Sequence, residues 1–193
     1  MLKMPWSGSG RGVRPMGRRE LDERDWAWVR RTLNRQGGVE VEPYYNKVQD
    51  FALEYWAEGG RVSYEGLSVF ETTAGGVYAG NLVASEQQKM ARLAPYLSAS
   101  LLREVSQRVQ ALLEEAPIPR WYTGPVGVDM MLVRVGSSEA VALHPLVEVN
   151  LRMTMGWVAL QLKRKLPPGG SGTFKILFAD GQYLALLPKN DPK

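Results

Sequence analysis

The sequence predicts an α+β protein in which an antiparallel sheet is backed by helices. Apolar residues recur at helical spacing over residues 21–35, 98–115 and 157–166, which is typical of amphipathic helices. β-type runs lie between the first two of these stretches and again after the second, and glycine pairs separate several of them. A chain of 193 residues with 45% apolar content is long enough to bury the core that this arrangement needs.

The first half of the chain predicts one helix followed by a sheet. The helix over residues 21–35 follows a glycine-rich loop and is expected to stop at Gly37-Gly38. Gly59-Gly60 and Gly75-Gly76 are the turn residues expected of hairpins, so the β-type runs around them predict a largely antiparallel sheet. These runs cover residues 39–45, 50–57, 61–72 and 77–84.

The second half predicts a long helix, two strands, a short helix and a hairpin. The helix over residues 98–115 is closed by Pro117 and Pro119 and is expected to cover the sheet. The elements that follow are strands over residues 126–135 and 144–151 around a turn at 136–138, a helix over 157–166, and a hairpin of residues 173–179 and 182–188.

The composition excludes several kinds of site. The chain has no cysteine, which rules out disulfides, thiolate metal sites and cysteine nucleophiles, and the expected location is a reducing cytoplasm. His144 is the only histidine, which argues against a hydrolase triad. Charged residues interrupt every apolar stretch before the roughly 18–20 residues of a membrane-spanning helix, and no signal-like run follows the start.

The formal net charge of +4 permits nucleic acid, a membrane surface or a phosphorylated ligand as partner. The basic excess lies early in the chain, where arginines are frequent up to Arg35 and are diluted by acidic residues. Two interpretations of these arginines stay open, a solvated helix face and a phosphate-facing surface.

A lysine and a glycine-rich loop form the first candidate site. Lys3 is followed by Ser7-Gly-Ser-Gly-Arg-Gly12, in which glycines alternate. Such a loop can bring backbone N–H groups close to a polyphosphate, and a lysine adds a point charge. The loop matches neither a P-loop nor a dinucleotide fingerprint. A flexible linker is the alternative interpretation.

Polar residues in the two late strands form the second candidate site. Asp129 is followed by Glu148-Val-Asn150-Leu-Arg152, and strand alternation would project Glu148, Asn150 and Arg152 from one face while the intervening apolar residues face the core. Two carboxylates and an amide oxygen suit Mg²⁺, which also binds phosphate oxygens. Arg152 could stabilise charge on a transferring phosphoryl group. A salt bridge between Glu148 and Arg152 is the structural alternative.

With its two candidate sites in this order, the chain resembles the ATP-grasp superfamily over most of its length. The resemblance implies that Lys3 and the glycine loop close over the phosphates of ATP as part of a lid. It also implies that Glu42 contacts the ribose or adenine edge, with Tyr44, Tyr45 and Met131 at the adenine. The loop residues concerned are Ser7, Gly8, Ser9, Gly10, Arg11 and Gly12.

In the same family, magnesium ligands lie in an acidic strand and in a Glu-x-Asn-x-Arg segment. The resemblance therefore implies Asp129, Glu148 and Asn150 as ligands of Mg²⁺, with Mn²⁺ as an alternative cation, and Arg152 as a catalytic residue. Lys89, in Glu86-Gln-Gln-Lys89, falls where biotin carboxylase-like members carry a basic residue near the acceptor. A surface helix residue is the alternative for Lys89.

The resemblance divides the chain into a partial lid over residues 1–40 and a catalytic body over residues 41–193, with ATP between them. Family members normally begin with a preATP-grasp domain that has no counterpart here. We therefore expect a fragment, a start further upstream, or a separate chain that supplies the missing half.

The predicted function is that of an ATP- and Mg²⁺-dependent carboxylate-amine ligase that acts through an acyl-phosphate. Its partners would be ATP, a small-molecule carboxylate and an amine acceptor, without a membrane. The alternatives are an ATP-binding module or kinase-like member without ligase activity, and a basic nucleic-acid-binding domain. The sequence does not identify the acceptor substrates, the activity of the chain alone, or its oligomeric state.

Overall fold

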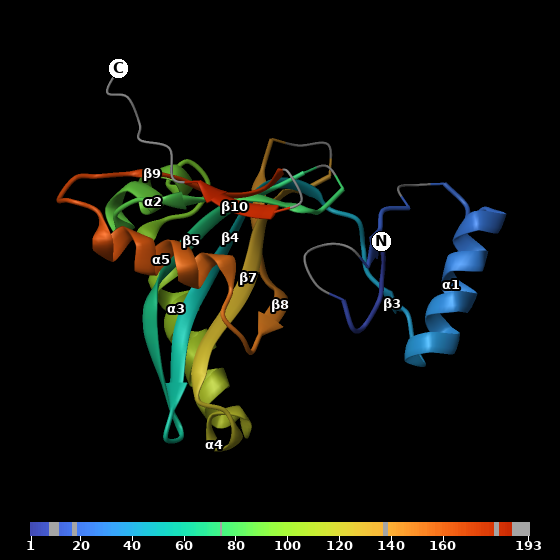
Figure 1. The fold of residues 1–193 in the computed structure, drawn as a ribbon, viewed down its shortest axis with the longest axis horizontal. Coiled ribbons are helices and arrows are strands. Elements are labelled where there is room, and N and C mark those ends of the chain that lie inside the picture. Colours follow the sequence, from blue (N-terminus) through green and yellow to red (C-terminus); the bar gives the residue numbers. More distant parts are fainter. Residues whose placement is uncertain (8–11, 17–18, 74, 137–138, 180–181, 187–193) are drawn as a thin grey trace. The chain divides into compact units, whose positions relative to one another are not determined.

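The computed structural model describes residues 1–7, 12–16, 19–73, 75–136, 139–179 and 182–186 (Figure 1). The chain divides into two compact units. Unit 1 comprises residues 1–46 and 72–78, and unit 2 comprises residues 47–71 and 79–193. Within the described part of the chain, no helix has the length and apolar character needed to cross a lipid bilayer.

Unit 1 contains a small sheet and one helix. Strands β1 (Leu2–Lys3), β2 (Val13–Arg14) and β3 (Glu40–Val41) pair antiparallel in the order β2-β1-β3. Helix α1 spans Glu23–Gln36. It ends where the sequence predicts, because Gly37 adopts the left-handed conformation (φ 76°) that glycine accommodates readily, and its N–H bonds the carbonyl of Leu33.

Helix α1 begins with a reciprocal capping box. Asp22 accepts from the N–H of Asp25, and Asp25 accepts from the N–H of Asp22. The carboxylate of Asp25 is fully buried and also pairs with Arg14 at 2.8 Å and Arg19 at 2.5 Å. Two of the early arginines thus serve the fold of unit 1.

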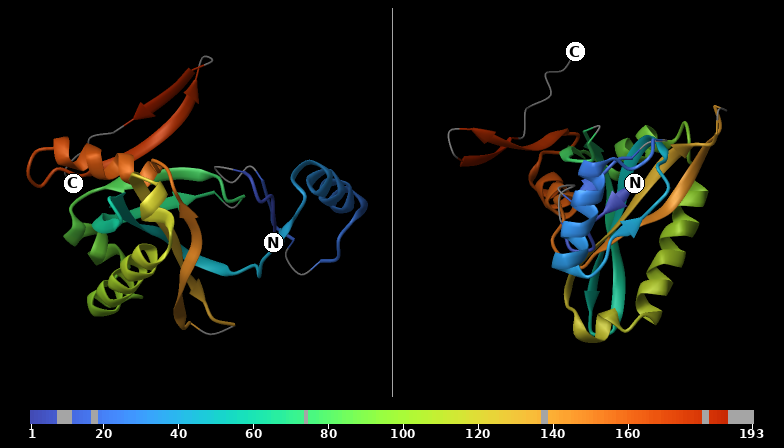
Figure 2. Two further views of the ribbon diagram at one scale, coloured as in Figure 1. Left: turned by 90° about the horizontal axis from the view of Figure 1, so that it is seen from below. Right: turned by 90° about the vertical axis from the view of Figure 1, so that its right-hand side faces the viewer.

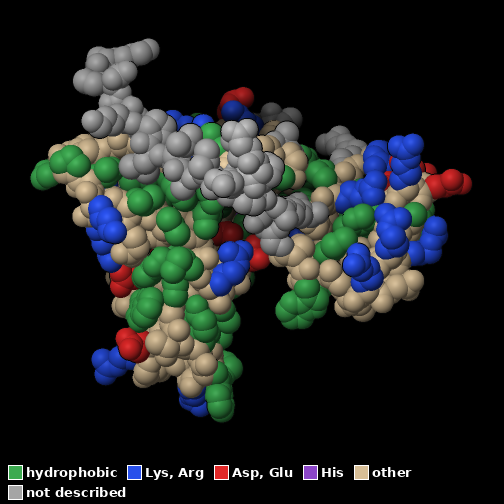
Figure 3. All heavy atoms as spheres, viewed as in Figure 1, with side chains coloured by type: hydrophobic (Ala, Val, Ile, Leu, Met, Phe, Trp, Pro, Cys, Tyr) green, Lys and Arg blue, Asp and Glu red, His purple; other side chains and the backbone are tan. Residues whose placement is uncertain are grey.

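Other basic side chains gather over α1 (Figure 3). The exposed arginines of this helix are Arg24, Arg30, Arg31 and Arg35. A solvated helix face is therefore the structural setting of these arginines.

Unit 2 is built on a seven-stranded sheet in the order β10-β9-β6-β5-β4-β7-β8. The β4–β5, β6–β9, β7–β8 and β9–β10 ladders are antiparallel. The strands are β4 (Asn46–Glu58), β5 (Arg61–Thr72), β6 (Tyr78–Val83), β7 (Gly124–Arg134), β8 (Val141–Asn150), β9 (Gly172–Ala179) and β10 (Gln182–Leu186).

The helices of unit 2 cover both faces of this sheet. They are α2 (Glu86–Leu93), α3 (Ala99–Glu115), α4 (Ile118–Trp121) and α5 (Met155–Lys165). Helices α3 and α5 lie on opposite faces of the sheet, which the two views of Figure 2 and Figure 1 show together. The predicted α+β fold with an antiparallel sheet backed by helices is confirmed.

The main core lies on the α3 face. Alternate residues of β4 and β7 point there and pack with α3, namely Phe51, Leu53, Tyr55, Val126, Val128 and Met130. Because side chains alternate along a strand, the residues between them point to the α5 face. Glu54 and Asp129 are among these residues, so the α5 face carries the polar groups of unit 2.

The structure corrects the expectation that the apolar residues between Glu148 and Arg152 are buried. Val149 and Leu151 are 38% and 42% exposed. The reason is topological, because β8 is the outermost strand on its side of the sheet. The strand also ends at Asn150, so Arg152 lies beyond the strand.

Candidate functional site

Three of the predicted metal ligands meet across the β7–β8 ladder of unit 2. Asp129 lies directly opposite Glu148, and Gly127 lies directly opposite Asn150. The Nδ2 of Asn150 donates a hydrogen bond to Oδ2 of Asp129 at 3.1 Å. The register of the two strands therefore brings two carboxylates and one amide together on the same face of the sheet.

The electrostatics of Asp129 indicate a place for a positive charge. Burial and, to a smaller extent, the neighbouring carboxylate of Glu148 raise the pKa of Asp129 to about 7, against the opposing effect of the hydrogen bond from Asn150. Two adjacent carboxylates with little counter-charge repel each other, and a bound cation would remove that repulsion.

The side chains at this site are too few to enclose a metal ion by themselves, but they suit Mg²⁺. Within the described residues, no group of three or more His, Cys, Asp or Glu side chains is arranged to hold a metal ion. Magnesium commonly uses only one or two carboxylates and completes its shell with waters and phosphate oxygens. Asn150 could add its Oδ1, because its Nδ2 is already bonded to Asp129. The residues therefore fit Mg²⁺ together with a phosphate ligand.

Arg152 lies near this cluster but outside the strand. Its positive charge lowers the pKa of both Asp129 and Glu54. Its side chain is exposed, and the ion pairs of the described residues do not include one between Arg152 and Glu148. The internal salt bridge considered as an alternative is thus not observed.

Glu54 is a buried carboxylate beside the site that the sequence analysis missed. It is fully buried on β4, and its Oε1 accepts a hydrogen bond from Oγ1 of Thr154 at 2.8 Å. Burial, aided by the charge of Asp129 and opposed by the hydrogen bond from Thr154, raises the pKa of Glu54 to about 7. The available signal was a single carboxylate inside the apolar run of residues 51–57.

Lys89 is engaged in the fold of unit 2. Only 1% of Lys89 is exposed, and its Nζ donates to the carbonyl of Leu67 at 2.7 Å. The carboxylate of Glu86, one turn earlier on α2, accepts from the N–H of Leu67. The two side chains thus satisfy the backbone of Leu67 on β5, and burial lowers the pKa of Lys89. The predicted catalytic role of Lys89 stays a prediction.

The predicted nucleotide residues of unit 1 form local contacts with one another. The Nζ of Lys3 lies 2.7 Å from Oε2 of Glu42. Ser7 Oγ donates to the carbonyl of Met4 at 3.3 Å, and a Cβ on Gly12 would lie 2.4 Å from Cβ of Ser7. Glycine at position 12 is therefore needed for the start and end of the loop to approach each other.

Of the other predicted nucleotide residues, the structure describes Tyr44, Tyr45 and Met131. Tyr44 and Tyr45 are 56% and 37% exposed. Met131 is partly buried on β7, opposite His144. Gly8, Ser9, Gly10 and Arg11 lie outside the described residues.

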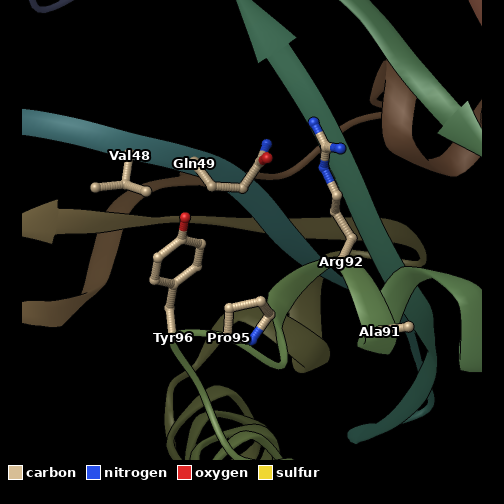
Figure 4. A pocket seen from close by; sticks show the side chains of 6 residues that line it. All are labelled: Val48, Gln49, Ala91, Arg92, Pro95 and Tyr96. Carbon is tan, nitrogen blue, oxygen red and sulfur yellow. The ribbon is translucent and has the colours of Figure 1, made fainter.

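A cavity of about 400 Å³ in unit 2 contains none of the predicted site residues (Figure 4). It lies where the start of β4 faces the end of α2, and the hydroxyl of Tyr96 points toward β4. Gln49 in its wall donates to the carbonyls of Asp50 and Phe70. The full lining is Val48, Gln49, Ala91, Arg92, Pro95 and Tyr96.

Structural comparison shows that this arrangement of strands and helices is an ATP-grasp fold. Biotin carboxylase from Campylobacter jejuni, in a beta-gamma-ATP complex, matches with a TM-score of 0.54 and 13% identity over 91% of this chain and 41% of its own. N5-carboxyaminoimidazole synthetase from Staphylococcus aureus, complexed with ADP, matches with a TM-score of 0.53 and 12% identity over 93% and 46%.

A third structure gives the same result. The biotin carboxylase domain of the 2-oxoglutarate carboxylase from Hydrogenobacter thermophilus, solved with MgADP, ADP and bicarbonate, matches with a TM-score of 0.52 and 13% identity over 91% of this chain and 40% of its own. The chain thus spans less than half of each of these structures. No protein-family model matches the sequence, and no curated protein matches it in sequence.

Proposed function

We propose that this chain binds Mg-ATP and forms the nucleotide-binding and catalytic part of an ATP-dependent ligase that joins a carboxylate to an amine. The observation that carries the proposal is the meeting of Asp129, Glu148 and Asn150 on one face of the β7–β8 ladder. Burial and the adjacent carboxylate of Glu148 raise the pKa of Asp129 to about 7, and a bound cation would stabilise the charged form of this side chain.

The mechanism follows from what these side chains can do. Asp129, Glu148 and Asn150 would hold Mg²⁺, which when bound supplies positive charge to the β- and γ-phosphate oxygens. A substrate carboxylate would attack the γ-phosphorus in line to give an acyl-phosphate and ADP, and an amine would then displace phosphate. The guanidinium of Arg152 would stabilise negative charge in both steps, since arginine matches phosphate oxygens in a bidentate geometry.

In unit 1, Lys3 can bind a phosphate only if its ion pair with Glu42 breaks. For Lys3 to bind a phosphate, its ammonium group must exchange the carboxylate of Glu42 for the nucleotide. Glu42 would then be available to hydroxyl groups of the ribose. The pair is partly exposed, and exposed ion pairs contribute about 0–1 kcal/mol, so this exchange costs little.

The structural neighbours support the nucleotide part of the proposal and the kind of chemistry. Those solved with β,γ-ATP, ADP or MgADP include two biotin carboxylases and N5-carboxyaminoimidazole synthetase. The carboxylate and the amine acceptor of this chain are part of the proposal alone.

Calorimetric titration of the chain with Mg-ATP tests the proposal. We expect magnesium-dependent binding that is lost in an Asp129→Ala/Glu148→Ala double variant. Glu139→Ala is the matched control, because Glu139 lies next to the same β7–β8 hairpin and its side chain is 95% exposed. A folded chain that binds Mg-ATP equally well with and without both carboxylates would refute the assignment.

The reaction is tested separately by product analysis of the purified protein. A ligase needs both acceptors before ADP accumulates, whereas a kinase-like protein needs only one. Unchanged turnover in a Glu148→Ala variant would remove this carboxylate from the mechanism.

A further inference from the structure

The three-residue segment that carries Arg152 is held at both of its ends. Asn150, at its start, is paired with β7 and bonded to Asp129. Thr154, at its end, is buried and bonded to Glu54. Residues 151–153 between them are exposed. The position of Arg152 therefore depends on two anchors, and only the first of them belongs to the proposed metal site.

The second anchor joins Glu54 to the start of α5. Thr154 is the N-cap of this helix, where its Oγ1 accepts from the N–H of Trp157 at 2.9 Å and donates to Oε1 of Glu54 at 2.8 Å. The hydroxyl thus uses its donor on the sheet and its acceptor on the helix. The carboxylate of Glu54 lies at the positive end of the α5 dipole, which favours this placement.

The surroundings leave the carboxylate of Glu54 little freedom. A Cβ on Gly156 would lie 2.1 Å from Oε1 of Glu54, and a Cβ on Gly127 would lie 3.1 Å from its Oε2 and 2.6 Å from Cγ2 of Thr154. The backbone of α5 at Gly156 and that of β7 at Gly127 thus pack directly against the carboxylate. Its Oε2 is buried and has no hydrogen-bond partner among the described residues. A side chain confined in this way is a rigid support for Thr154.

The geometry points to Glu54 and Thr154 as positioning residues that hold Arg152 at the candidate phosphate site. This inference rests on the proposed function, since it assigns Arg152 to the γ-phosphoryl group. Neither residue touches the nucleotide in this arrangement. Their effect passes along the chain from Thr154 to Arg152, and its loss would let the segment 151–153 move.

The test compares two nucleotides that differ in the γ-phosphate. Thr154→Val keeps the shape of the side chain but removes both hydrogen bonds, and Thr154→Ser keeps the hydroxyl. We expect Thr154→Val to lower the affinity for Mg-AMPPNP about tenfold, which is the scale of one lost hydrogen bond between Arg152 and the γ-phosphate. The affinity for Mg-ADP should stay within about twofold. Thr154→Ser should retain the affinity for both.

A second set of variants approaches the same hydrogen bond from Glu54. Glu54→Met removes the acceptor and should show the same selective loss, provided that thermal melting shows it folded. The Arg152→Ala/Thr154→Val double variant should bind Mg-AMPPNP no more weakly than Arg152→Ala alone, because both changes act through one side chain. Equal losses for the two nucleotides, or additive losses in the double variant, would overturn the inference in favour of a purely structural cap.

Hydrogen exchange separates this inference from the proposed function. In the nucleotide-free chain, Thr154→Val should raise exchange in peptides covering residues 151–157 without a change in the β4–β5 hairpin. If the wild-type chain binds neither nucleotide, the proposed function fails. The exchange result still shows whether the hydrogen bond between Thr154 and Glu54 restrains residues 151–153. Unchanged exchange over residues 151–157 would overturn it.

Discussion

The ammonium group of Lys3 and the carboxylate of Glu42 lie 2.7 Å apart in unit 1, although the resemblance to the ATP-grasp superfamily implies a separate contact of each with a nucleotide. The antiparallel pairing of β1 with β3 explains their contact, because Lys3 lies opposite Glu40, and Glu42 is its diagonal neighbour on the same face, within reach of a long side chain. The backbone N–H of Glu42 also bonds the carbonyl of Met1. In the described structure, each side chain therefore satisfies the charge of the other.

Replacement of Lys3 by methionine should lower the affinity for Mg-ATP about tenfold while changing the melting temperature very little. The affinity falls because a cation facing the phosphates is lost, and the stability hardly changes because a partly exposed ion pair contributes about 0–1 kcal/mol. Titration calorimetry and thermal melting measure the two effects. Lys165→Met, an exposed lysine in the last turn of α5, is the control. Wild-type affinity in Lys3→Met would exclude this residue from the site.

Most of the fold could be predicted from the sequence, because helix periodicity, helix ends and tight turns depend on residues that are close together in the chain. The period of α1 and its glycine stop are confirmed at Gly37, and the turn at Gly59-Gly60 connects β4 to β5 as expected. Helix α2 was not predicted as an element, since it has only eight residues and contributes few apolar side chains to the core. Its buried Lys89 shows why, because a lysine inside a fold gives no hydrophobic signal.

The candidate site was predictable only where its residues share a strand or neighbouring strands. Asp129, Glu148 and Asn150 follow from spacing within two strands joined by a short turn. Glu54 does not, because its partner Thr154 lies 100 residues further along the chain. The contact between Glu54 and Thr154 depends on the strand order β4-β7-β8 and on the placement of α5. Local sequence patterns predict neither of them.

The stability of the metal-free chain should fall as the pH rises from about 4.5 to 7. In the unfolded chain Glu54 and Asp129 ionise near 4.5 and 3.8, whereas the pKa of each is about 7 in the folded chain. Between these values the folded state binds more protons than the unfolded state, so stability decreases with increasing pH and levels off above 7. The expected contribution of Glu54 is on the order of 2–3 kcal/mol.

Urea unfolding with EDTA at pH 5.0 and pH 7.5 measures this difference. Glu54→Gln should reduce it, because the amide does not titrate, and Asp129 should account for most of what is left. Glu139→Gln is the control, since Glu139 is 95% exposed. A pH difference that is identical in the wild type and in Glu54→Gln would contradict the raised pKa of Glu54.

Lys89→Met should destabilise unit 2 by about 1–3 kcal/mol, because it leaves the buried carbonyl of Leu67 without its donor. Arg92→Met on the same helix is the matched control, as the side chain of Arg92 is 59% exposed and should change stability by less than about 0.5 kcal/mol. Denaturant unfolding of both variants gives the comparison. Equal stability of the two would show that the contact between Lys89 and β5 is dispensable.

Gly156→Ala tests the packing around Glu54. Two effects predict opposite signs for the resulting change in the free energy of unfolding. Helix propensity favours alanine over glycine by about 1 kcal/mol in a helix interior, and by less at Gly156, the second residue of α5. The contacts predict the reverse, because the new Cβ would lie 2.1 Å from Oε1 of Glu54 and 2.5 Å from Oγ of Ser68. Both neighbours are buried, so neither can move aside without displacing other groups.

We therefore expect Gly156→Ala to lower the free energy of unfolding by about 2–3 kcal/mol, as overpacking of a closed site does. Gly38→Ala is the control, because its nearest neighbour, Cγ of Pro5, lies 3.7 Å away from the new Cβ, and it should be neutral or slightly stabilising. The cost of Gly156→Ala should shrink in a Glu54→Ala background, where one of the three colliding atoms is gone. A stabilised Gly156→Ala variant would mean that α5 does not close on Glu54, and the support for Thr154 and Arg152 would fall with it.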